Sequence, residues 1–86
     1  MNINQLIAIV KNKLQTEIII QNLEIEDKSY LHKNHKGNKE GRFHLKLTIK
    51  SDELNKLSKI VATKKIYSVL SYELKEHIHS IQILLD

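Results

Sequence analysis

The chain has 86 residues and no cysteine, so its length suits one domain and its composition excludes disulfides, thiolate catalysis and a cluster held by its own sulfur. Hydrophobic residues make up 41% and charged residues 28%, which is typical of a folded globular domain and excludes wholesale disorder. The net charge of +4 permits contact with nucleic acid, an anionic membrane or an acidic protein, and favours none of them.

The first half of the chain is predicted to form a helix, a strand and a long loop. Apolar residues at three- and four-residue spacing indicate one face of a helix: Ile3, Leu6, Ile7, Val10 and Leu14. Asn2 can cap this helix. Leu23 and Ile25 alternate with acidic residues, as in a half-buried strand. Residues 27–41 are polar and contain both glycines, so they are predicted to be an exposed loop.

The second half is predicted to contain a strand, helical segments and a final strand. Strict alternation puts four apolar residues on one strand face: Phe43, Leu45, Leu47 and Ile49. Ser51 or Asp52 can cap a short helical turn that bears Leu54, Leu57 and Val61. A longer helix is expected around Ile66, Leu70 and Leu74, and a last strand is expected to present one face: His79, Ile81, Ile83 and Leu85.

These elements predict a single small α+β domain over residues 1–86, in the order α-β-β-α(α)-β. Helices that cover one face of a three-stranded sheet would bury all the apolar stripes together. No apolar run is long enough to cross a membrane, so we expect a cytoplasmic protein without a membrane partner.

Spaced residues along this element order resemble the BolA family, whose fold is similar to the type II KH domain. The first matching stretch is residues 23–32, a strand followed by Ser-Tyr and a histidine that enters the loop. Further matches lie at Gly37 and Phe43, at Leu54, Leu57, Ser58 and Ile60, along the helix (residues 66–70 with Glu73 and Leu74), and at residues 78–81. The resemblance covers nearly the whole chain.

The resemblance implies a non-enzymatic adaptor that partners a monothiol glutaredoxin and shares a two-iron two-sulfur cluster with it. The implied role lies in iron–sulfur assembly, cluster transfer or iron and redox regulation. In this family the histidine at the position of His79 ligates iron, and a loop histidine is the second ligand. That second ligand is His32 here, with His35 as the alternative. The partner would supply its cysteine and glutathione, and the isolated chain would hold no cofactor.

The residues themselves leave the roles of the histidines open. His79 shares strand parity with Ile81 and Ile83, so its side chain is expected to point toward the helix-covered face, either as an iron ligand or as a histidine satisfied at the edge of the core. His77 is expected to end the preceding helix, and His44 is expected on the polar face of its strand as an exposed surface residue. The chain has no nucleophile motif, Gly-rich phosphate loop or spaced carboxylate pair, and we expect no enzyme.

The alternative function is a DNA-binding transcriptional regulator of the BolA type. Four lysines lie around the main helix: Lys56, Lys59, Lys64 and Lys65. They would attract phosphate without sequence preference, or they would simply form the solvent-exposed face of that helix. The chain departs from the family at two places: Lys56 replaces a glycine, and residues 62–64 keep one charge of a basic triplet. The reduced triplet weakens this alternative, because that segment is the part credited with nucleic-acid contact in the family. KH domains clamp RNA with a Gly-x-x-Gly loop between helices, and both glycines here lie between strands. Alone, the chain is expected to be a monomer or a weak homodimer.

Overall fold

A computed structural model describes residues 1–29 and 42–86. Its elements are, in chain order, α1 (Ile3–Glu17), β1 (Asn22–Asp27), β2 (Phe43–Lys50), α2 (Asp52–Asn55), α3 (Lys59–Val69), α4 (Ser71–Glu76) and β3 (Ile78–Leu85). The predicted order is confirmed, and the main helix is divided at Leu70 into α3 and α4. Most of the predicted loop, residues 30–41, lies outside the described residues.

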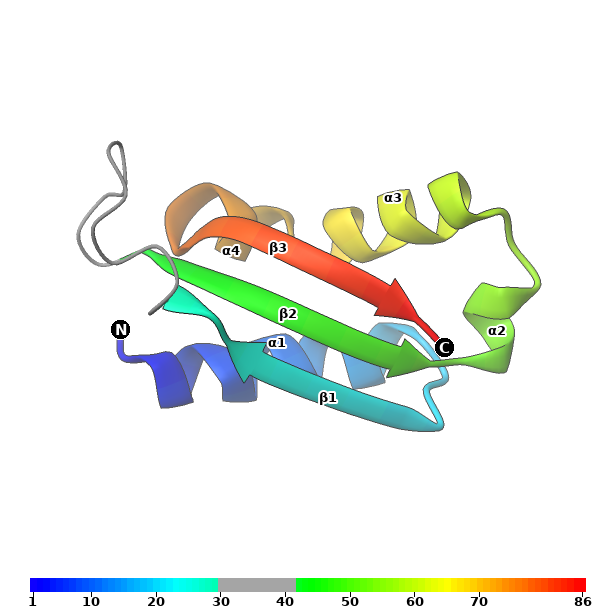
Figure 1. The fold of residues 1–86 in the computed structure, drawn as a ribbon, viewed down its shortest axis with the longest axis horizontal. Coiled ribbons are helices and arrows are strands. Elements are labelled where there is room, and N and C mark those ends of the chain that lie inside the picture. The colour runs from blue at the N-terminus through cyan, green and yellow to red at the C-terminus, as the bar shows by residue number, and fades with distance from the viewer. Residues whose placement is uncertain (30–41) are drawn as a thin grey trace.

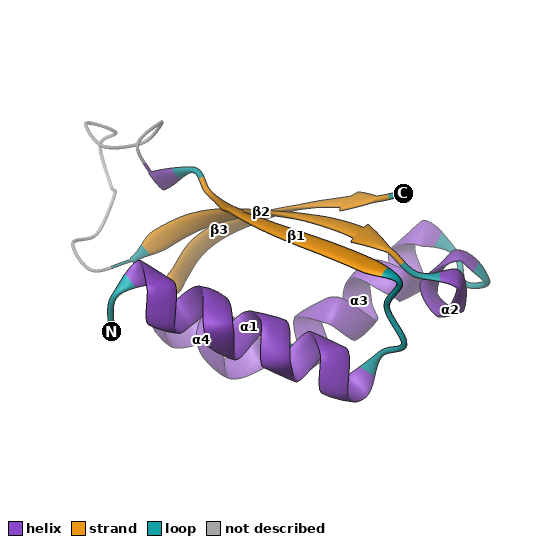
Figure 2. Ribbon diagram, turned by 90° about the horizontal axis from the view of Figure 1, so that it is seen from below, coloured by secondary structure: helices purple, strands orange, loops and turns teal. Residues whose placement is uncertain are grey.

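The sheet is mixed and has β2 at its centre (Figure 1). β1 pairs with β2 antiparallel and places Leu23 opposite Ile49, whereas β3 pairs with β2 in parallel and places Ile83 opposite Leu47. A parallel pair needs a crossover connection, which α2, α3 and α4 supply. Figure 2 shows α1, α2, α3 and α4 on one face of the sheet, as the apolar alternation of the strands predicts.

The core forms between that face and the helices. The predicted stripe of α1 is confirmed at its centre, where Leu6, Val10 and Leu14 are buried. They pack with buried residues from the other elements: Leu45, Leu47, Ile49, Leu54, Ala62, Ile66, Leu70 and Ile78. The predicted cap is present, because the Asn2 side chain accepts the Gln5 N–H at 2.8 Å. Within residues 1–29 and 42–86, no helix is long and apolar enough to cross a membrane.

The short helical turn differs from the expectation that it bears Leu54, Leu57 and Val61. α2 ends at Asn55, and of the three only Leu54 is buried. Ser58 begins a separate helix, because its hydroxyl accepts the Val61 N–H at 3.2 Å and caps α3. Leu57 is therefore left in the connection, and Val61 lies on the exposed side of α3.

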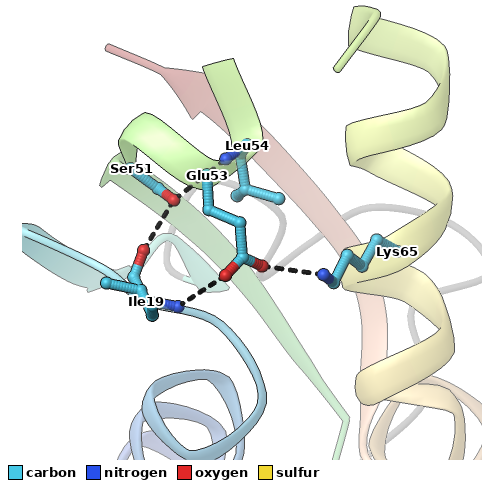
Figure 3. A network of polar contacts seen from close by, with 5 residues as sticks. All are labelled: Ile19, Ser51, Glu53, Leu54 and Lys65. Carbon is cyan, nitrogen blue, oxygen red and sulfur yellow. Dashed lines mark hydrogen bonds and ion pairs between the residues drawn. The ribbon is translucent and has the colours of Figure 1, made fainter. Parts of the chain in front are cut away.

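A polar network joins the end of α1, the start of α2 and the middle of α3 (Figure 3). The buried Ser51 hydroxyl donates to the Ile19 carbonyl at 2.7 Å and accepts the Leu54 N–H at 3.1 Å. The Glu53 carboxylate accepts the Ile19 N–H at 3.3 Å and pairs with the Lys65 ammonium at 2.7 Å. Both backbone groups of Ile19 are thus satisfied by the segment that follows β2.

A second long-range ion pair joins α4 to α1. The Glu73 carboxylate is 4% exposed and lies 2.7 Å from the ammonium of Lys13, which remains partly in solvent. A buried carboxylate without a partner would be strongly destabilising, so this pair is a condition for packing α4 against α1.

The first testable prediction concerns Ser51. Ser51→Ala should lower the free energy of unfolding by about 1–3 kcal/mol, because it removes the cap of α2 and leaves the Ile19 carbonyl without its hydroxyl donor. Urea unfolding measures the change. Ser71→Ala, at an exposed serine whose side chain caps no helix, is the matched control and should stay within about 0.5 kcal/mol of wild type. Equal losses in the two variants would contradict the role assigned to Ser51.

The second prediction concerns pH. The hydrogen bond from Lys65, helped by the Ile19 N–H, holds the pKa of Glu53 below its ordinary value of 4.5. A group with a lowered pKa stabilises the folded state above its unfolded-state pKa, and this contribution disappears as pH falls through the folded-state pKa. The stability difference between wild type and Glu53→Gln should therefore be larger at about pH 6 than at about pH 3. Glu24→Gln, on the exposed side of β1, is the control, and a pH-independent difference for Glu53→Gln would contradict the assignment.

Candidate functional site

His79 lies in a β-bulge at the beginning of β3. Phe43 is opposite Ile78, but the next residue, His44, is opposite Ser80, so His79 is the extra residue on β3. A bulge interrupts the alternation of a strand and aims its side chains in new directions. Ile78 is buried in the core, whereas His79 and Ser80 are both exposed.

The expectation that the His79 side chain points toward the helix-covered face, together with Ile81 and Ile83, is wrong. The extra residue breaks the parity between position 79 and position 81, and Ile78 takes the inward place instead. Sequence alternation alone does not reveal an inserted residue, because the apolar pattern on either side of it remains intact. The His79 imidazole is therefore accessible to another molecule and is not satisfied within the core.

His44 lies beside His79, and its expected place on the exposed surface is also wrong. It is 4% exposed although it lies on the sheet face opposite the helices. Its Nδ1 is hydrogen-bonded to the Ser80 hydroxyl at 2.6 Å, and its backbone N–H donates to the Ser29 hydroxyl at 3.0 Å. The rings of His44 and His79 are 5.0 Å apart between centroids and inclined by 54°. The bulge places both His79 and Ser80 beside this ring, and no sequence signal indicated that contact.

The other histidines have different positions. The prediction that His77 ends a helix is confirmed, since it is the C-cap of α4 and its N–H donates to the Glu73 carbonyl at 2.8 Å. Its ring packs edge-on against Tyr72, with centroids 5.8 Å apart. His32 and His35 lie outside the described residues, so the assignment of a second ligand to either stays a prediction.

The four lysines predicted for nucleic-acid contact differ in whether they form an ion pair within the fold. Lys65 pairs with Glu53, and its cation is engaged within the fold. Lys56, at the C-cap of α2, and Lys59 and Lys64, on α3, are exposed. In the described part of the chain no ion pair joins these three to an acidic side chain.

His79 is a single accessible imidazole, and its chemistry can be compared with what a metal centre needs. Residues 1–29 and 42–86 contain no group of three or more His, Asp or Glu that could hold a metal ion together. An accessible neutral imidazole is nevertheless a proper ligand for iron, and histidine nitrogen can replace thiolate on one iron of a two-iron two-sulfur cluster. His79 is thus chemically suited to be one ligand of such a centre.

The chain is similar to known proteins over most of its length. Residues 14–85 match the family described as BolA-like protein. The DNA-binding transcriptional regulator BolA of Haemophilus influenzae is 32% identical over 75 residues, which cover 87% of this chain and 70% of that protein. SufE-like protein 1, chloroplastic/mitochondrial, of Arabidopsis thaliana is 32% identical over 80 residues. That match covers 87% of this chain but only 22% of the plant protein.

A solved structure has the same fold. The BolA domain of SufE1 from Arabidopsis thaliana superposes with a TM-score of 0.77 at 33% identity, and the match covers 92% of this chain and 87% of that one. The helix–strand–strand–helix–strand order and the mixed three-stranded sheet thus occur in a relative whose sequence is clearly similar. The family match over residues 14–85 and the regulator matched over 70% of its length show that this chain belongs to the BolA family.

Proposed function

We propose that this chain is an adaptor that partners a monothiol glutaredoxin and binds a two-iron two-sulfur cluster shared with it. The observation that carries the proposal is the accessible imidazole of His79, which a β-bulge presents at the head of β3 in a chain without cysteine. The role would be cluster assembly, cluster transfer or iron and redox regulation, and it needs no catalytic group from this chain.

In this proposal the ligands come from both proteins. His79 supplies one imidazole nitrogen and His32, or alternatively His35, supplies a second from the segment between β1 and β2. The glutaredoxin supplies its cysteine and bound glutathione. Replacing thiolate by neutral imidazole makes the cluster less negative and raises its reduction potential, so partnership with this chain would change the redox behaviour of the glutaredoxin cluster.

Two features of the chain support an encounter of this kind. Its net charge of +4 would steer it toward an acidic partner surface. The second feature is the contact between the His44 and His79 rings. This contact limits the rotamers of His79, so less side-chain entropy would be lost when its nitrogen binds iron. The proposal includes a cytoplasmic location, with which a chain without cysteine is compatible.

A DNA-binding regulator is the second candidate, and the name of the Haemophilus influenzae relative favours it. Lys56, Lys59 and Lys64 would make the phosphate contacts, since Lys65 is already paired with Glu53. The two candidates respond differently to salt. Binding through phosphate contacts weakens steeply as salt is added, whereas ligation at iron depends on the histidines.

The position of His79 leads to a stability prediction. His79→Ala should change the free energy of unfolding by less than about 0.5 kcal/mol, because its side chain is exposed. His44→Ala should cost about 1–3 kcal/mol, because it removes a buried ring and the partner of the Ser80 hydroxyl. Urea unfolding of both variants provides the measurement. A larger loss for His79→Ala than for His44→Ala would mean that His79 is structural.

The functional prediction uses visible circular dichroism of a cluster-loaded monothiol glutaredoxin titrated with this chain. Wild type should change the spectrum, and His79→Ala should lose that change, because its side chain offers no nitrogen to iron. His32→Ala and His35→Ala should differ from each other and so identify the second ligand. His77→Ala, whose ring packs on Tyr72, is the matched control and should resemble wild type.

The proposal would be rejected if the wild-type chain left the spectrum unchanged, or if His79→Ala produced the same change as wild type. Binding to a short DNA duplex that falls steeply between low and moderate salt, together with an unchanged cluster spectrum, would instead establish the second candidate.

A further inference from the structure

β3 is an edge strand of the sheet within the described residues. In the part of the chain that the structure describes, β3 pairs with β2 and with no other strand. The Asp86 N–H donates to the Ile49 carbonyl at 2.8 Å, so the even-numbered residues at this end of β3 direct their backbone groups toward β2. Backbone groups of a strand alternate between its two sides, so the N–H and C=O groups of Ile81, Ile83 and Leu85 face the free edge.

This edge lacks the features that usually protect a strand from pairing with another chain. Residues 78–85 contain no Lys, Arg, Asp, Glu or Pro. Exposed edges in natural proteins are commonly blunted by charges, proline or a covering segment, because their unpaired backbone groups are a template for a further strand. Ile81, Ile83 and Leu85 are only partly buried, so they have apolar surface left to cover. The edge is therefore chemically suited to accept a strand.

The helix layer continues past this edge. Figure 1 shows α3 on the outer side of β3, beyond the limit of the sheet. A groove of about 230 Å³ lies between the end of β3 and the connection from α2 to α3, with Leu54, Leu57 and Ile83 among its lining residues. A second groove, of about 420 Å³, lies on α3 between Ile60 and Tyr67. Lys59 lines both grooves, so they are adjacent.

The second groove exposes apolar side chains on a helix. Ile60 is 69% exposed and Tyr67 is 45% exposed, and their seven-residue spacing puts them on the same side of α3. Leu57, between the helices, is 37% exposed. A strand added beside β3 would extend the sheet over α3 and would cover this apolar surface as well as the free backbone groups.

We propose that the β3 edge accepts an extended segment of a partner protein as a fourth strand, with apolar side chains in the two grooves and acidic side chains against the lysines. This mode of recognition combines main-chain hydrogen bonds, which give affinity, with pockets for alternate side chains, which give specificity. The proposal is independent of the cluster proposal, because the grooves lie toward the C-terminal end of β3 and His79 lies at its beginning.

Charge indicates which occupant fits. Lys59 and Lys64 border the grooves, and Lys56 lies in the sequence between Asn55 and Leu57, which line the first groove. None of the three has an ion pair within residues 1–29 and 42–86. A second copy of this chain would bring the same lysines and another charge of +4, so self-pairing is opposed by repulsion. Duplex DNA would use the lysines but would leave the edge amides unpaired and the apolar surface uncovered. An acidic and apolar extended segment satisfies all three features.

Amide hydrogen exchange of the full chain, with and without an end-blocked peptide that alternates glutamate with leucine, tests the proposal. In the free chain the amides of Ile81, Ile83 and Leu85 should exchange faster than those of Gln82 and Leu84, which face β2. Saturating peptide should slow exchange at the three edge amides at least about tenfold. The same peptide with N-methylated backbone amides keeps its charges and side chains but cannot complete the ladder, and should bind about tenfold more weakly.

Variants separate the groove from general attraction between opposite charges. Leu57→Glu and Lys59→Glu should each weaken binding of the peptide about tenfold, whereas Lys11→Glu, an equal change of charge at an exposed position of α1, should change it less than about threefold. Unfolding curves of the three variants confirm that each is folded under the conditions used.

Three outcomes would overturn the proposal. Equal weakening by Lys11→Glu and Lys59→Glu, with edge amides unprotected, would reduce the binding to net charge. Edge protection that rises with protein concentration in the absence of peptide would show that a second copy occupies the edge. Displacement of the peptide by a short DNA duplex, again without edge protection, would assign the lysines to nucleic acid.

Discussion

The parallel pairing of β3 with β2 is the constraint on which the rest of this structure depends. Parallel neighbours begin at the same end of a sheet, so the chain must cross back over one face before β3 can start. The crossover is the succession of α2, α3 and α4, and with α1 it covers the apolar face of all three strands. The same pairing brings the head of β3 beside the head of β2, which is why His79 meets His44.

The two ends of β3 have different chemical character because different parts of the chain surround them. At its beginning, the bulge turns His79 outward and the neighbouring ring of His44 supports it. At its end, the connection between α2 and α3 leaves a groove lined by Leu54, Leu57 and Ile83, with Lys59 at its border. A domain of this size has little interior to spare for a pocket, and both candidate sites lie at the surface, at the two ends of one edge strand.

Polar contacts between distant segments hold this arrangement together. Ser51 and Glu53 fix both backbone groups of Ile19, and the Glu73–Lys13 pair fixes α4 on α1. In the sequence, Glu53 and Glu73 look like ordinary exposed helix residues, but these contacts show that both connect distant segments of the fold. They also change the nucleic-acid hypothesis, because the Glu53 carboxylate engages Lys65, one of the four lysines expected to contact phosphate.

Much of the fold follows from the sequence because local periodicity and capping are local properties. The stripe of α1, its Asn2 cap, the alternation of β2 and the element order were all predictable, and the BolA resemblance followed from residues spaced along them. The division of the main helix at Leu70 and the early end of α2 were not, since they depend on how each segment packs.

By itself the sequence determined most of the apolar faces that form the core, such as the stripe of α1 and the alternation of β2, and it marked the histidine at the head of the last strand as a candidate. Only the tertiary structure decided where that histidine points. One extra residue in β3 reverses the parity of His79, and its effect on the side chain exists only relative to the register of β2. The contact of His44 with His79 and Ser80, and the edge position of β3 among the described strands, both follow from the strand order β1-β2-β3.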